Sequence, residues 1–165
     1  YNLVVTFHSR DEEEWGVTDG SKEEVQSYFQ GICPKARQLI DLPKTWKRWA
    51  TADREPIGQW TYGRVTLLGD AAHPMLPYLA QGAGMAIEDA QAMGRALATA
   101  GATPKALAQY AQARWQRNAR VQKRSLRNAW IFHVTGPVRW GRDLAMRALG
   151  ERLLDLPWLY GGPPN

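Results

Sequence analysis

Residues 69–74 read Gly-Asp-Ala-Ala-His-Pro, and they stand between an apolar run at 65–68 and a helix-like segment from Met85 to Ala98. This order predicts a buried strand that brings Asp70 to its carboxyl end, then a glycine-containing turn and the start of a helix. Ligands of open α/β sheets bind at such strand ends, and helix N-termini favour negative charge. The stretch therefore predicts an α/β fold with a ligand site at this turn.

The same stretch resembles the second flavin-binding motif of the class A flavoprotein aromatic hydroxylases, which are FAD-dependent monooxygenases of the hydroxybenzoate type. The match runs from Asp53 to Gly94 and takes in Gly69 to His73, Pro77 and Gly82. The resemblance implies an α/β (α+β) fragment: the C-terminal part of a Rossmann-like FAD-binding fold, with part of a substrate-domain sheet and C-terminal helices. We expect three regions, namely a substrate-sheet part at 1–62, the second half of the FAD-binding domain at 63–100 and a helical region at 101–165.

One element of that family does not occur in the sequence. A Gly-x-Gly-x-x-Gly turn after the first strand holds the FAD pyrophosphate in the family, and these 165 residues contain no such pattern. The chain also opens on Tyr1 without an initiator methionine. We therefore expect the C-terminal part of a longer enzyme, inactive by itself, whose other part holds the ADP-binding βαβ unit.

The resemblance assigns cofactor contacts to the turn and to the helix start. It implies that Asp70 holds the ribityl chain of FAD, although an aspartate here can also cap a helix. Gly69 keeps the turn free of a Cβ clash. Arg54 is expected at the cofactor edge, with a surface ion pair as its alternative. The remaining predicted contacts near the flavin ring come from the segment before and at the helix start, namely Gln81, Gly82, Ala83 and Gly84.

Three residues are candidates for the substrate side. The resemblance places Pro77 beside the substrate, where its carbonyl can accept a hydrogen bond from a phenol or a water. Tyr78 either lines the substrate pocket or packs in the core, and the sequence favours neither. His73 is a motif residue that could act as a base, but structural packing is the stronger interpretation. The three histidines have no metal-ligand spacing, so no metal site is expected.

The family implies a defined reaction. NADH or NADPH reduces FAD, O2 converts the reduced flavin to a C4a-hydroperoxide, and an electron-rich phenol takes up the distal oxygen. The wording of residues 74–82 is most similar to enzymes for salicylate, 3-hydroxybenzoate or a hydroxypyridine acid. The alternatives are a related flavoenzyme, such as an epoxidase or a halogenase, and a fragment that cannot hold FAD.

Composition agrees with this family without deciding it. The net charge of +5 is explained more simply by a basic solvated surface than by attraction of anionic ligands. The single cysteine suits a reducing cytoplasm, and no apolar run or signal peptide points to a membrane. A basic stripe from Arg114 to Arg127 is interpreted as a solvated helix face or a homodimer contact rather than a nucleic-acid site. The pair Glu88-Asp89 is interpreted as surface or packing residues.

The pattern of apolar residues and caps predicts the remaining elements. Strands are expected at 1–8, at 46–52 and, as a central strand, at 64–68, and residues 11–20 are expected to form an acidic loop. Ser21 and Glu24 have the spacing of a capping box, and a second short helix is expected at 35–42. Long helices are expected at 84–100 and from Thr103-Pro104 towards His133, and a last one at 138–149.

Overall fold

The computed structural model describes residues 2–9, 16–153 and 155–161. The chain divides into two compact units, residues 1–51 and 52–165, and each is described by itself. The partition expected at residues 62 and 100 stays a prediction.

The first unit pairs a two-stranded antiparallel sheet with two helices. Strands β1 (Val17–Gly20) and β2 (Trp46–Trp49) pair with Val17 opposite Trp49. Helices α1 (Lys22–Tyr28) and α2 (Pro34–Asp41) lie between them in sequence. The side chain of Ser21 accepts the backbone N–H of Glu24 at 2.9 Å, which confirms the predicted cap. The core of this unit consists of Val25, Ile40 and Trp46.

Two predictions for this unit are wrong. Residues 2–9 form no strand, because among the described residues no neighbouring strand pairs with them. The alternation still identified an inward face, since Val5 packs on the core and Phe7 stacks on Tyr28 at 4.0 Å between ring centroids. The expected loop at 11–20 ends in β1 instead, because residues 17–20 find a partner in β2; residues 10–15 lie outside the described residues.

The second unit begins with a small hairpin. Strands β3 (Thr61–Tyr62) and β4 (Val65–Thr66) pair antiparallel around Gly63, whose φ is +57°. The expected central strand at 64–68 is therefore wrong in this chain. Among the described residues β4 pairs with β3 alone, and Val65 is 67% exposed. A run of apolar residues indicates that a strand can be buried, but the strands that would bury it must be supplied by other segments.

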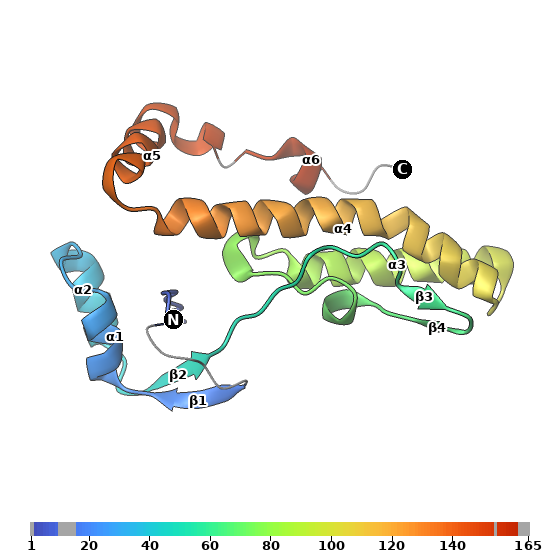
Figure 1. Cartoon of the computed structure of the whole chain (residues 1–165), viewed down its shortest axis with the longest axis horizontal. Coiled ribbons are helices and arrows are strands. Elements are labelled where there is room, and N and C mark those ends of the chain that lie inside the picture. The colour runs from blue at the N-terminus through green and yellow to red at the C-terminus, as the bar shows by residue number, and fades with distance from the viewer. Residues whose placement is uncertain (1, 10–15, 154, 162–165) are drawn as a thin grey trace. The chain divides into compact units, whose positions relative to one another are not determined.

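Helices form most of the second unit (Figure 1). After the short turns η1 (Gly69–Ala71) and η2 (Pro77–Leu79), the long helices α3 (Gly82–Ala100) and α4 (Pro104–His133) pack side by side. Gly101 ends α3 at a φ of +66°, and the Thr103 hydroxyl accepts the Ala106 N–H at 3.3 Å, so both predicted caps are confirmed. The unit ends in α5 (Gly136–Leu149), η3 (Gly150–Leu153) and α6 (Pro157–Tyr160).

Two apolar clusters hold these helices around the turn. The first joins Trp60 and Ala72 to Tyr110 and Ala111 of α4. The second joins Met85 of α3 to Val121 of α4 and to Leu159 of α6. The hydroxyl of Tyr110 also donates to the carbonyl of Leu67 at 3.2 Å. The segment between β4 and α3 is thus anchored on both long helices.

Candidate functional site

The predicted turn is fixed by hydrogen bonds to its backbone. Gly69 has a φ of +59°, a conformation that favours glycine, and its carbonyl accepts the N–H groups of Ala72 and His73 at 2.9 Å each. On the outer side, Arg54 donates from Nη2 to the carbonyls of Ala71 and Ala72 at 2.7 and 2.8 Å. Arg54 therefore holds the turn itself, and its expected contact with the cofactor stays a prediction.

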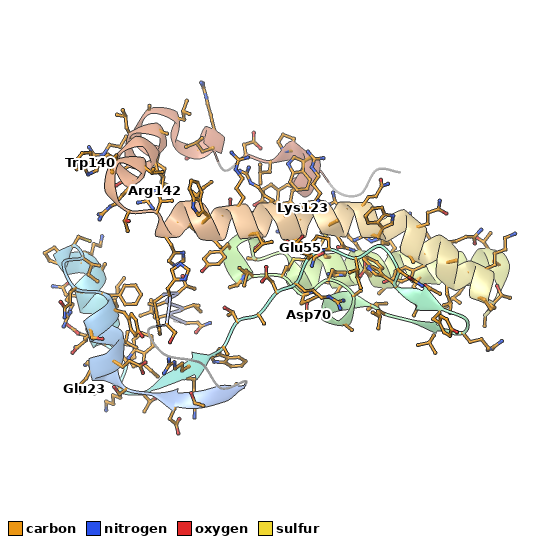
Figure 2. All side chains as sticks on the ribbon, viewed as in Figure 1. Glu23, Glu55, Asp70, Lys123, Trp140 and Arg142 are labelled. Carbon is orange, nitrogen blue, oxygen red and sulfur yellow. The ribbon has the colours of Figure 1, made fainter. Side chains whose placement is uncertain are left out.

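The turn places Asp70 next to the start of α3. Figure 2 shows Asp70 on this turn, and its side chain is exposed. A methyl group added at Gly82 would lie 3.7 Å from Oδ1 of Asp70. Gln81, the residue before the helix, makes no capping bond with its side chain. Because the first N–H groups of a helix have no acceptor within the helix, Gly82, Ala83 and Gly84 present donors beside an exposed carboxylate.

This arrangement suits part of FAD. A carboxylate accepts hydrogen bonds from ribityl hydroxyls, and the donors at a helix N-terminus favour an anionic group such as reduced flavin. Small side chains at residues 82–84 allow backbone to approach such a ligand closely. The four residues Asp70, Gly82, Ala83 and Gly84, which the sequence predicted as cofactor contacts, are brought together here. Gly69, whose N–H is bound by Asp89 of α3, stays a predicted cofactor contact.

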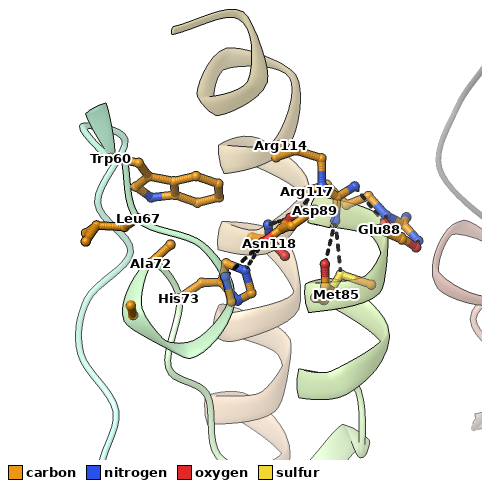
Figure 3. A network of polar contacts seen from close by, with 12 residues as sticks. Trp60, Leu67, Ala72, His73, Met85, Glu88, Asp89, Arg114, Arg117 and Asn118 are labelled. Atoms are coloured by element: carbon orange, nitrogen blue, oxygen red, sulfur yellow. Dashed lines mark hydrogen bonds and ion pairs between the residues drawn. The ribbon is translucent and has the colours of Figure 1, made fainter. Parts of the chain in front are cut away.

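A buried carboxylate fastens this turn to α3 (Figure 3). Asp89 is fully buried, and its Oδ2 accepts the N–H of Gly69 at 3.3 Å and contacts Nε2 of His73 at 2.5 Å. Its Oδ1 accepts hydrogen bonds from Nε of Arg114 at 2.8 Å and from Nδ2 of Asn118 at 3.0 Å. One carboxylate therefore joins the turn, α3 and α4.

The charges around Asp89 extend outward along α3 and α4. Arg114, 3% exposed, also donates from Nη1 to Oε2 of Glu88 at 2.7 Å. Arg117 binds both oxygens of Glu88, at 2.8 and 2.9 Å, and donates to the carbonyls of Trp158 and Leu159 in α6. These contacts tie the C-terminal segment to the two long helices.

Two predictions are corrected by this network. Arg114 and Arg117 do not belong to a solvated face, because buried or half-buried acids of α3 pair with them. Glu88 and Asp89 are not merely surface or packing residues. Neighbours on a helix do not face each other, yet the guanidinium of Arg114 is long enough to reach both.

The network also sets the ionisation of both acids. Burial alone would raise the pKa of Asp89, but hydrogen bonds from His73, Arg114 and Asn118 outweigh it and lower that pKa to about 2. Burial likewise opposes ionisation of Glu88, and hydrogen bonds from Arg117 and Arg114 hold its pKa below the usual value. Both acids are therefore carboxylates at neutral pH.

Acid is expected to weaken the fold through Asp89. Its folded pKa of about 2 lies below that of an unfolded aspartate, so its stabilisation is complete above about pH 4 and is lost as the pH falls through about 2. The shift corresponds to about 2 kcal/mol. Urea unfolding at steps from pH 5 to pH 2 measures it. The loss should be smaller in Asp89→Asn, and equal slopes in both proteins would contradict the assignment.

His73 lies inside this network rather than at a surface. Its side chain is fully buried, its ring centroid is 5.5 Å from that of Trp60, and Nδ1 has no hydrogen-bond partner among the described residues. This burial favours the packing interpretation that the sequence already ranked first. The catalytic role of His73 stays a prediction.

Pro77 and Tyr78 border an apolar cavity of about 780 Å³ between η2, the end of α4 and α5. Tyr78 is half-buried and packs edge-on against Phe132 and His133, with ring centroids 5.8 and 5.6 Å away. Tyr78 thus borders a cavity and also packs on its neighbours, and that this cavity is the substrate pocket stays a prediction. Pro77 is exposed, and its carbonyl accepts the N–H of Ala80 at 3.0 Å, which leaves one lone pair of that oxygen. The roles of both residues towards a substrate stay predictions.

Two features are absent from the described residues, 2–9, 16–153 and 155–161. No group of three or more His, Cys, Asp or Glu is placed to hold a metal ion. No helix in this part of the chain combines the length and apolarity needed to span a membrane.

Sequence reasoning missed the polar partners that α4 supplies. Asn118, Gln122 and Ser125 are at most 3% exposed, although their residue types are usually found at surfaces. Their spacing of four and three residues places them on one helix face together with Arg114. That periodicity was a usable signal, but it did not reveal which segment the face contacts.

Comparisons with known proteins show which family the chain is similar to. A family model described as FAD binding domain matches residues 1–125. Proteins named 3-hydroxybenzoate 6-hydroxylase from Polaromonas naphthalenivorans and Klebsiella oxytoca are 62% and 51% identical over 164 residues. Each alignment covers 98% of this chain and 41% of the relative, so the chain spans about two fifths of their length.

Solved structures show the same fold. A salicylate hydroxylase substrate complex matches with a TM-score of 0.75 and 28% identity, over 94% of this chain and 38% of that one. Klebsiella pneumoniae HpxO complexed with FAD and uric acid matches with a TM-score of 0.73 and 26% identity, over 81% of this chain and 35% of that one. The predicted fold class, a mixed helix-and-sheet part of an FAD-binding fold, is confirmed. So is the resemblance to flavoprotein aromatic hydroxylases, and the chain belongs to the family of FAD-binding domains.

Proposed function

We propose that the protein carrying this chain is an FAD-dependent monooxygenase that hydroxylates 3-hydroxybenzoate at C6. The observation that carries the proposal is the 62% identity, over almost the whole chain, to a relative named for that reaction. In the overall reaction, the acid, O2, NAD(P)H and a proton give the hydroxylated acid, water and NAD(P)+. C6 is para to the phenol oxygen, which makes it the electron-rich carbon that an electrophilic oxygen meets.

In this proposal the cofactor supplies the redox and oxygen chemistry, and the chain binds and orients it. Asp70 accepts hydrogen bonds from the ribityl hydroxyls. The N–H groups of residues 82–84 donate to the pyrimidine side of the flavin and stabilise its anionic form, and Gln81 lies at the same edge. Pro77 offers its remaining lone pair to the substrate phenol or to a water, and Tyr78 forms part of the wall beside it.

The test uses the complete protein. A yellow protein whose NADH or NADPH oxidation accelerates with 3-hydroxybenzoate, and whose product is 2,5-dihydroxybenzoate by mass and chromatography, would support the proposal. Faster turnover with salicylate or a hydroxypyridine acid would move the substrate assignment but keep the reaction. A halogenated or epoxidised product would replace the reaction. A colourless complete protein that does not take up FAD would overturn the proposal and favour a helix-rich binding module.

The location and assembly are part of the same proposal. We place the protein in the cytoplasm, where the exposed thiol of Cys33 stays reduced and NAD(P)H is available. The exposed aromatic side chains of Trp130 and Trp140, 63% and 74% accessible, support a homodimer. Light scattering on the complete protein measures its mass directly, and a monomer at micromolar concentration would rule the dimer out.

A further inference from the structure

Four polar side chains form a row on one face of α4. Asn118, Gln122, Ser125 and Asn128 are separated by four, three and three residues, the spacing of one helix face. The first three are at most 3% exposed, and Asn128 is half-buried. We call these four residues the polar ladder. A buried row of this kind needs partners, because an unpaired polar group away from water is costly.

The partners are the buried acid and the backbone of the loop after the turn. Asn118 donates to Asp89, as described above. The next three donate to alternate carbonyls of the loop, and each bond falls two residues further along it. The pairs are Gln122 Nε2 to Pro74 at 2.9 Å, Ser125 Oγ to Leu76 at 2.5 Å and Asn128 Nδ2 to Tyr78 at 3.3 Å.

This loop depends on such donors. Pro74 and Pro77 have no N–H, so the segment cannot form a regular ladder with another strand. Leu76 is extended, with φ of −63° and ψ of 151°, and it directly precedes η2. In an extended segment alternate carbonyls point the same way. The polar ladder therefore fixes the loop on α4 at regular intervals, from the cofactor turn to the residues that border the cavity. The short helix η2 also packs on α4 (Figure 1).

We propose that the polar ladder positions Pro77 and Tyr78 relative to the cofactor, with Ser125 as the main positioning residue. Ser125 makes the last fully buried contact before Pro77, and its partner Leu76 is the residue from which η2 begins. The cofactor end of the loop is held without Ser125, by Asp89 at Gly69 and by Arg54 at Ala71 and Ala72. Loss of the Ser125 hydroxyl should therefore disturb the substrate end and spare the cofactor end. The inference rests on the proposed function.

The test compares two variants of the complete protein: Ser125→Ala removes the hydroxyl, and Ser125→Thr keeps one. Ser125→Ala is expected to raise the KM for 3-hydroxybenzoate about tenfold, the ratio that one lost buried hydrogen bond can produce. A larger share of NAD(P)H oxidation should then yield hydrogen peroxide instead of product. The Kd for FAD should stay within about twofold, because its contacts are held elsewhere. Ser125→Thr should recover product yield. Gln116→Ala, on an exposed part of the same helix, is the matched control and should behave as wild type.

The outcomes separate the two proposals. If wild type oxidises no aromatic acid, the proposed function fails. If wild type is active and Ser125→Ala keeps the wild-type KM and product yield, the ladder has no positioning role. An equal rise in the Kd for FAD would also overturn it, since that indicates general loosening. Should Ser125→Ala not fold, Asn128→Ala decides by the same measurements, because its bond to Tyr78 lies at the half-buried end of the row.

Discussion

Arg114→Met is expected to lower the free energy of unfolding by about 3–5 kcal/mol, the cost of leaving a buried charge without its partner. Arg114 is almost completely buried and is the only arginine that contacts both Glu88 and Asp89 among the described residues. Methionine fills similar length but donates no hydrogen bond. Asp89 would keep its contacts with Gly69, His73 and Asn118 while losing the one permanent positive charge at its side.

Urea unfolding of the complete protein, with and without FAD, measures this loss. The matched control is Arg120→Met on the same helix, because Arg120 is exposed and lies over the Trp158 ring at 3.9 Å. That change should cost about 1 kcal/mol or less. If Arg114→Met and Arg120→Met differ by less than about 0.5 kcal/mol, the buried network does not stabilise the fold as argued.

A double-mutant cycle isolates the pair. Asp89→Asn removes the negative charge and keeps the shape of the side chain. The double variant Asp89→Asn/Arg114→Met should be more stable than the sum of the two single losses predicts, by at least about 1 kcal/mol, because neither charge is then left alone. Strict additivity would mean that Arg114 acts through packing and through Glu88 rather than through Asp89.

Local signals in the sequence predicted the helices well. Ser21 with Glu24, Gly101 and Thr103-Pro104 each act within a few residues, so the caps and the helix bounds that depend on them are found where expected. Strands depend on partners distant in sequence. Residues 2–9 and 64–68 have suitable patterns, yet neither forms the expected strand within the described residues.

The site residues also fall into two groups, those that the sequence identified and those that it did not. Asp70 and residues 82–84 were identified because the wording of the turn is specific, and the structure brings them together. The ion pairs that hold the turn and α3 in place were not identified. Arginines at 114 and 117 repeat at helical spacing and are usually exposed, so the pattern alone favours a solvated stripe. Only the packing of α3 on α4 shows that Glu88 and Asp89 face them.

Asp70→Ala is expected to weaken FAD binding by the complete protein about ten- to a hundredfold. The loss follows from removal of a charged acceptor, for which a hydrogen bond contributes about 1.5–3 kcal/mol. Asp70→Asn keeps an acceptor oxygen without the charge and should lose about tenfold or less. Because Asp70 is exposed, the free energy of unfolding without FAD should change by less than about 0.5 kcal/mol in both variants.

Fluorescence titration of the apoprotein with FAD gives the Kd, and urea unfolding of the same samples gives the stability. Asp155→Ala, another exposed aspartate of the second unit, controls for the loss of one negative charge. The competing role for Asp70 is a helix cap, and it predicts the opposite pair of results: an unchanged Kd and a loss of about 1 kcal/mol in stability. The structure argues against capping, since the N-cap position of α3 belongs to Gln81 and the Asp70 carboxylate stays exposed beside the first N–H groups of the helix. A carboxylate that has no hydrogen-bond partner in the described part of the chain is available to a ligand hydroxyl, and the two measurements together distinguish that role from a structural one.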